Sequence, residues 1–275
     1  MDEYRIAANF DNRELNDRTF DKDLLLQLNP LYWEVTKNDR IPPVKRIVVD
    51  LQQVRYANPY GALGIVVLCE ILHSIFKQKV ELLLPSDDRG FQFSFWLDSL
   101  GFLNAVEDIA NIKGYFHTPH VNPNSNFIPV TRLKTWGDVF KVVDEIEEKI
   151  QVILIEKLEY SREEAYRFVT IMSELCQNIY YHSAPGGEPH SYISMQAYSN
   201  NLKFAVMDLG IGIPKTLKAK YQLDDDREAI WLACDAGITS KNRGGLGLYR
   251  TAQIVEGGEW IPQHPLRDRQ GPVHS

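Results

Sequence analysis

The sequence has few cysteines and no apolar run long enough to cross a membrane. Its three cysteines are far apart and form no CxxC pair, which argues against a zinc site or a disulfide framework and favours reduced thiols. The longest apolar stretch, residues 62–69, is far shorter than the roughly 20 residues that a membrane helix needs. The polar N-terminus lacks the apolar core of a signal peptide. We therefore expect a cytoplasmic protein with no membrane partner.

An excess of basic residues is also missing. The chain has 30 Lys and Arg residues against 37 Asp and Glu residues, a net charge of −7. This charge gives no general attraction to phosphate backbones, so a nucleic-acid partner is not expected. A hydrophobic fraction of 44% and a charged fraction of 24% are typical of globular proteins. The 275 residues suffice for one large domain or two ordinary ones.

Two widespread nucleotide-binding motifs are absent. The chain contains no GxxxxGK[ST], which excludes a Walker A loop. The glycines at Gly210 and Gly212 do not extend to GxGxxG, which disfavours a dinucleotide-binding fold.

A stretch rich in proline and asparagine, residues 118–129, is typical of a linker. It predicts an α/β two-domain chain divided into residues 1–125 and 126–275. In the first half, strands are expected at 46–51 and 80–84, a helix at 62–76, and a turn followed by an aromatic-rich helix over 87–103. In the second half, helices are expected at 136–159, 162–183, 227–234 and 246–255. Two further strands, 192–198 and 202–208, are expected to form a hairpin through the turn at 199–201.

The helix expected at 162–183 carries three polar residues on one slowly turning face. Glu174, Asn178 and His182 follow one another in steps of four. A carboxylate can orient or deprotonate a nucleophile, and an amide oxygen is a suitable ligand for Mg²⁺. The alternative is an ordinary amphipathic helix with a solvated polar stripe.

Two glycine-bearing segments follow this helix. The first reads Asp208-Leu-Gly-Ile-Gly-Ile-Pro after a predicted strand, so that Asp208 could accept a hydrogen bond from an exocyclic amine. The second reads Arg243-Gly-Gly-Leu-Gly-Leu before a predicted helix, where free N–H groups can meet phosphate. The alternatives are a simple turn and a flexible loop.

The order and spacing of these three segments, over residues 168–255, resemble the GHKL ATPase superfamily. That superfamily includes gyrase, heat-shock chaperone, histidine kinase and mismatch-repair ATPases and the anti-sigma-factor serine kinases. The resemblance implies that Asn178 coordinates Mg²⁺, that Glu174 acts as general base or orients the attacking group, and that Asp208 binds the adenine amine of ATP. His182 lies where histidine kinases carry a basic residue near the phosphates, and a surface histidine is a nearly equal alternative.

The resemblance also assigns roles to glycines and to a nucleotide lid. Gly210 and Gly212 would shape the pocket floor, and Gly245 and Gly247 would meet the phosphates. The lid would span residues 239–245 and place Lys241 and Arg243 within reach of phosphate. The prolines after Gly257 depart from the further strands with which the family usually ends.

The first half resembles the STAS domain of anti-sigma-factor antagonists over residues 47–64. In that family a loop serine accepts phosphate, whereas here the aligned position is Pro59, with Tyr60 as the nearest hydroxyl. The resemblance therefore implies that residues 1–125 form a docking or regulatory domain and not a phosphorylation switch.

Three functions remain open from the sequence. The first is an ATPase or a protein serine/threonine kinase of the anti-sigma-factor type, with a protein partner or substrate. The second is a non-catalytic switch gated by ATP. The third, a sensor histidine kinase fragment, is disfavoured because no histidine occurs between His120 and His182. A homodimer is left open.

Overall fold

The computed structural model describes residues 2–11, 13–86, 88–114, 127–182, 191–238 and 247–255. Its chain separates into two compact units, Met1–Leu133 with Tyr192–Asp208, and Lys134–Ser191 with Leu209–Ser275. The chain is mixed α/β, with a parallel sheet and an antiparallel sheet. The boundary expected between residues 125 and 126 lies outside the described residues.

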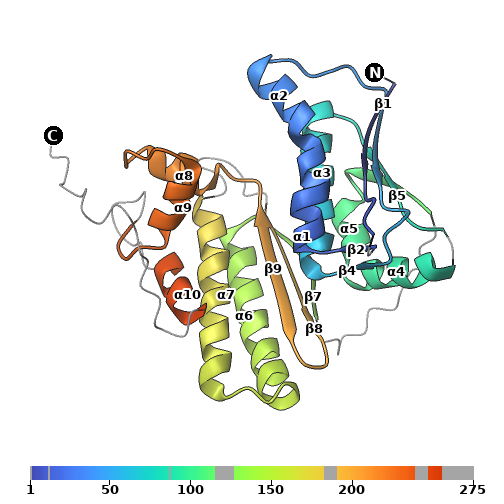
Figure 1. Cartoon of the computed structure of the whole chain (residues 1–275). Helices are drawn as coiled ribbons and strands as arrows, with labels where there is room; N and C mark the ends of the chain where they lie inside the picture. The colour runs from blue at the N-terminus through green and yellow to red at the C-terminus, as the bar shows by residue number, and fades with distance from the viewer. Residues whose placement is uncertain are drawn as a thin grey trace. The chain divides into compact units, whose positions relative to one another are not determined.

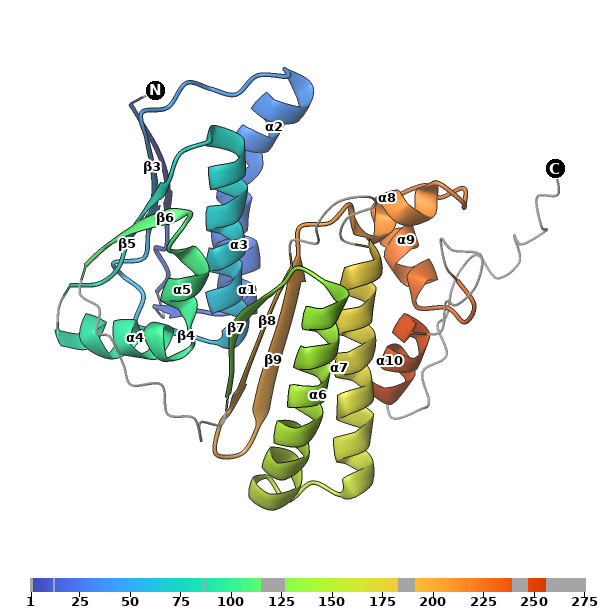
Figure 2. The same cartoon turned by 180° about the vertical axis from the view of Figure 1, so that it is seen from behind.

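A four-stranded parallel sheet forms the centre of the first unit. Its strand order is β1-β3-β5-β6, that is, Glu3–Ala7, Arg46–Asp50, Val80–Leu83 and Ala110–Lys113. The β-branched centre of β3 is fully buried, as expected for a central strand. Helices α3 (Pro59–Phe76) and α5 (Phe102–Val106) lie on the same face of this sheet (Figures 1 and 2).

Helix α3 is the central helix of this unit. Asn58 caps its start by accepting a hydrogen bond from the Gly61 N–H, and Pro59 occupies the first turn, where no N–H is needed. The expectation that no apolar run could cross a membrane counted only the uninterrupted stretch at 62–69, whereas by length and composition α3, alone in the described part of the chain, could do so. However, 67% of its apolar window is buried inside the protein, as in the core helix of a globular domain.

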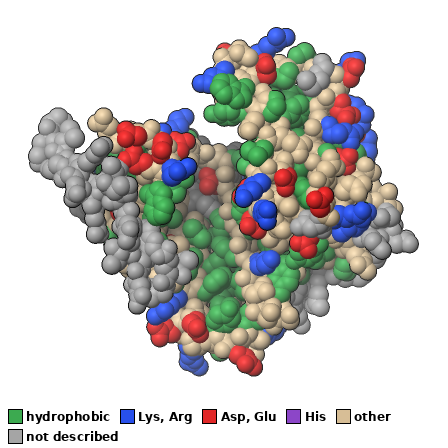
Figure 3. Space-filling model, in the orientation of Figure 1, with side chains coloured by type: hydrophobic (Ala, Val, Ile, Leu, Met, Phe, Trp, Pro, Cys, Tyr) green, Lys and Arg blue, Asp and Glu red, His purple; other side chains and the backbone are tan. Residues whose placement is uncertain are grey.

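Several elements of the first unit differ from the sequence expectation. The single helix expected after a turn within 87–103 is two helices, α4 (Asp88–Ser99) and α5, because Gly101 adopts a left-handed conformation with φ of 71°. The short pair β2 (Glu14–Leu15) with β4 (Tyr56–Ala57), and the helices α1 (Asp17–Thr19) and α2 (Asn29–Lys37), were not expected. Hydrophobic side chains, among them Tyr32 and Trp33, remain exposed over α2 (Figure 3).

A second sheet in this unit has the order β7-β8-β9, that is, Phe127–Leu133, Ser191–Ala197 and Leu202–Asp208. The expected hairpin is present, and the Tyr198 N–H donates to the Asn201 carbonyl at 2.7 Å across its turn. The prediction of a linker over residues 118–129 is wrong for residues 127–129. Strand β7 begins at Phe127 and buries Ile128, because apolar residues alternate along it despite the proline.

A buried carboxylate joins α3 to this second sheet. Glu70 of α3 is only 8% exposed and accepts hydrogen bonds from the Tyr192 hydroxyl on β8 and from Arg132 Nη2 on β7, the latter at 2.9 Å. Burial, and then the hydrogen bond to Glu70, raise the pKa of Tyr192. A buried charge is tolerated only when it is paired and hydrogen-bonded, so this cluster fixes α3 against β7 and β8.

The second unit is helical in its described part. Helices α6 (Trp136–Gln151) and α7 (Arg162–His182) run side by side, and α10 (Gly247–Val255) lies against α7 (Figures 1 and 2). Helices α8 (Gly212–Lys218) and α9 (Asp226–Ala233) pack on each other. The start expected for α7 is confirmed, since Ser161 and Glu164 exchange hydrogen bonds in a capping box.

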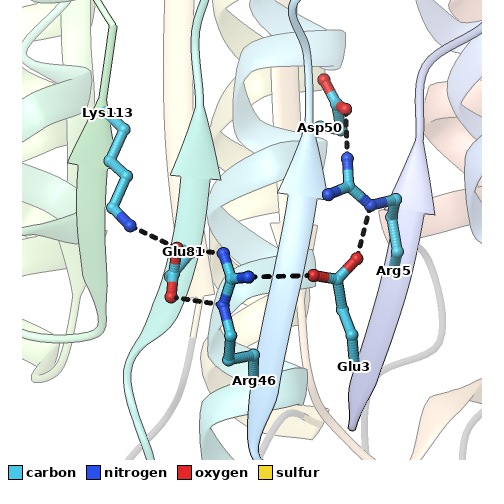
Figure 4. Close-up of polar contacts among 6 residues, drawn as sticks. All are labelled: Glu3, Arg5, Arg46, Asp50, Glu81 and Lys113. Atoms are coloured by element: carbon cyan, nitrogen blue, oxygen red, sulfur yellow. Dashed lines mark hydrogen bonds and ion pairs between the residues drawn. The ribbon is translucent and has the colours of Figure 1, made fainter.

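The face of the parallel sheet opposite α3 carries a network of ion pairs (Figure 4). Arg46 spans two strands, with Nη2 2.9 Å from Glu81 Oε2 and Nη1 3.3 Å from Glu3 Oε2. Arg5 bridges Glu3 at 2.7 Å and Asp50 at 2.5 Å, and Lys113 Nζ lies 2.6 Å from Glu81 Oε2. All-parallel sheets usually have both faces covered by helices, whereas here charged side chains cover one face.

This network predicts a pH dependence of stability. The hydrogen bonds from Arg46 and then Lys113 lower the pKa of Glu81 from 4.5 to about 2. A depressed pKa in the folded state means that the contribution is complete above about pH 4.5 and is lost as the pH falls towards 2. We expect Glu81→Gln to lower the free energy of unfolding by roughly 1 kcal/mol at pH 7, with the difference in urea titrations shrinking below pH 4.5 and disappearing as the pH falls through 2. The exposed Glu163→Gln serves as control, and a pH-independent difference would contradict the prediction.

Candidate functional site

Helix α7 presents Glu174 and Asn178 one turn apart. The opposite side of the helix is fixed by apolar burial, since Ala165, Val169, Met172 and Cys176 are all less than 9% exposed. Burial raises the pKa of the Cys176 thiol to about 12, so this cysteine is an inert core residue. The core therefore sets which way Glu174 and Asn178 point.

The first residue of α10 lies directly against these two side chains. A Cβ atom added to Gly247 would lie 2.5 Å from Glu174 Oε2 and 3.6 Å from Asn178 Nδ2. Only a residue without a side chain allows the carboxylate so close to the backbone at the start of a helix. The structure thus brings together two of the three segments that the sequence analysis singled out.

The contact between α7 and α10 also holds polar atoms. Asn178 Nδ2 and Thr251 Oγ1 are buried, and neither has a hydrogen-bond partner among the described residues. Arg250 Nη1 lies 3.7 Å from Glu174 Oε1, with side chains that are 57% and 23% exposed. Orphaned polar atoms beside a helix N-terminus and an arginine suit a polar, anionic ligand.

The protein groups at this contact are too few to hold a metal ion without further ligands from a bound molecule. Within the described ranges, no group of three or more His, Cys, Asp or Glu residues could hold an ion alone. Asn178 and Glu174 supply one amide and one carboxylate, and Mg²⁺ commonly completes such sets with phosphate oxygens and water. The residues present therefore fit Mg²⁺ that arrives with a phosphate ligand.

Of the other expected site residues, the structure describes Asp208, Gly210 and Gly212 and the backbone of His182. Asp208 is the exposed last residue of β9 and belongs to the first unit, whereas Gly210, two residues later, belongs to the second. Gly212 begins α8 with φ of 76°, a conformation that favours glycine. His182 ends α7, but its side chain lies outside the description, as do Lys241, Arg243 and Gly245.

Sequence reasoning missed Arg250 and Thr251. Arg250 follows Gly247 by three residues, so the two share a face of α10. That spacing could have marked Arg250 as a neighbour of any ligand at Gly247, although it could not reveal the pairing with Glu174.

The first turn of α3 places Tyr60 next to an acid. Its hydroxyl donates to Asp21 Oδ1 at 2.9 Å, and burial, followed by this hydrogen bond, raises the pKa of Tyr60 to about 12. Pro59 occupies the first helical turn. The Tyr60 hydroxyl, which follows the expected phosphoacceptor position directly, is thus engaged within the first unit.

Comparison of the chain with protein-family models, with curated proteins and with solved structures finds no match.

Proposed function

We propose that this protein binds ATP with Mg²⁺ in its second half, in the manner of the GHKL superfamily, and acts as an ATPase or protein serine/threonine kinase in the cytoplasm. The observation that carries the proposal is the close approach of Gly247 to Glu174 and Asn178. These residues come from two motifs that lie far apart in the sequence, and both were assigned to the phosphate end of ATP. We also propose that the parallel-sheet domain is STAS-like and binds a protein partner.

Each residue has a role that its chemistry allows. The N-terminus of α10 offers free N–H groups and a positive dipole to phosphate. Asn178 contributes an amide oxygen to Mg²⁺, which screens the phosphate charges when bound. Glu174 accepts the proton of the attacking hydroxyl or water, as a general base.

Removal of the Asn178 amide tests the binding site. In titration calorimetry we expect the wild type to bind ATP with Mg²⁺ and to lose this binding when a chelator removes the ion. We expect Asn178→Ala to lose most of the Mg²⁺-dependent affinity. The matched control is Gln177→Ala, which removes the neighbouring amide. Gln177 Nε2 donates to Ser173 at 3.0 Å and has no role in the proposed site. Unchanged Mg²⁺-dependent binding by Asn178→Ala would disprove the role given to Asn178.

The same titration with GTP tests base recognition by Asp208, which stays a prediction. GTP offers a carbonyl where adenine has an amine, so a site that relies on a carboxylate acceptor rejects it. Equal affinities for ATP and GTP would exclude this role.

Incubation with γ-labelled ATP and cell lysate separates catalysis from switching. Label on a protein indicates a kinase, and free phosphate indicates an ATPase. Binding without either reaction indicates the alternative, an ATP-gated switch that changes how the STAS-like domain binds its partner.

A further inference from the structure

Glu174 and a terminal phosphate would both be negative and close together. The start of α10, where the proposed function places phosphate, lies within contact distance of the Glu174 carboxylate. Two negative charges at such a distance repel each other. Because the Glu174 side chain is only 23% exposed, water screens this repulsion incompletely. A site that holds both anions needs a nearby cation.

Arg250 is the cation that the described residues supply. Its Nη1 lies 3.7 Å from Glu174 Oε1, and it stands on the same face of α10 as Gly247. Because the guanidinium is always charged and has five donors, it can hold one carboxylate oxygen and still face another anion. Resting on the proposed function, we propose that Arg250 is a positioning residue. It neutralises Glu174 and holds its carboxylate beside the start of α10, so that the site can accept a terminal phosphate.

Replacing Arg250 and Glu174 by glutamine, which is neutral and of similar size, tests this inference by measuring binding affinity without turnover. With a non-hydrolysable ATP analogue and Mg²⁺ in calorimetry, we expect Arg250→Gln to weaken affinity about tenfold, because Glu174 then repels the phosphate. The double variant Glu174→Gln with Arg250→Gln is expected to return to within about threefold of the wild type, because neither charge remains. Arg250→Lys is expected to keep most of the affinity, since it retains the charge.

The control is Arg167→Ala, which breaks an arginine–glutamate pair of the same kind elsewhere on α7. It should bind as the wild type does. Recovery in the double variant separates the proposed role from a structural one, since a misfolded α10 would not be restored by a second substitution. Two results would overturn the inference. One is a wild-type affinity of Arg250→Gln for the ATP analogue, and the other is an affinity of the double variant as low as that of Arg250→Gln. Absence of binding by the wild type would instead overturn the proposed function.

Discussion

Glu174→Gln is expected to slow phosphoryl transfer or hydrolysis by about 100- to 10,000-fold, because general-base assistance contributes that much to a rate. The affinity for MgATP should be at least that of the wild type, since the substitution removes a negative charge beside the position proposed for the phosphates. Single-turnover assays with labelled ATP measure the rate, and calorimetry measures the affinity.

Glu163→Gln is the control, because Glu163 lies on the same helix in an exposed ion pair with Arg167. If Glu174→Gln lost MgATP binding while staying folded, Glu174 would be a binding group and not a base. If it turned over ATP like the wild type, the catalytic role would be wrong.

Gly247→Ala is expected to be the second damaging change. The new methyl group would lie 2.5 Å from Glu174 Oε2, so the carboxylate must swing away. Because the displaced atom is the end of a flexible side chain, the melting temperature should barely change. Turnover should fall about 100-fold, since a misplacement of about 1 Å in a catalytic group can cost that much.

The comparison variant is Gly137→Ala on α6, where an added Cβ would meet only Thr135 Oγ1 at 3.5 Å. It should leave turnover unchanged. Wild-type turnover in Gly247→Ala would show that the contact between α7 and α10 lies away from the chemistry.

Elements with a strong local pattern could be predicted from the sequence. Helices α3 and α7 and strands β3, β5, β8 and β9 were expected close to their observed bounds, because each combines an apolar period with a turn or cap at its ends. Strands β1 and β6 were missed for a physical reason. Both lie at the edges of the parallel sheet and point charged residues, such as Arg5 and Lys113, to its open face. They therefore lack the continuous apolar run of a buried parallel strand.

The site could be predicted in part. The grouping of Glu174 and Asn178 follows from helical spacing, and the motif order suggested Gly247 as their neighbour. The pairing of Arg250 with Glu174 depends on how α10 packs on α7, a tertiary relation that no local pattern encodes. The roles of His182, Asp208, Gly210, Gly212, Lys241, Arg243 and Gly245 stay predictions.

The buried Glu70 has a consequence for how the chain is made. Its partner Tyr192 lies 122 residues later in the sequence. During synthesis the hydrogen bond between them can therefore form only after Tyr192 has emerged from the ribosome. A fragment that stops at Leu133 would retain α3 and the parallel sheet but lose β8 and β9. Such a fragment would bury a carboxylate without its tyrosine or expose the apolar surface around it. Expression of the first domain in isolation therefore requires Tyr192–Asp208 to be supplied as well, for example through a short loop in place of residues 134–191.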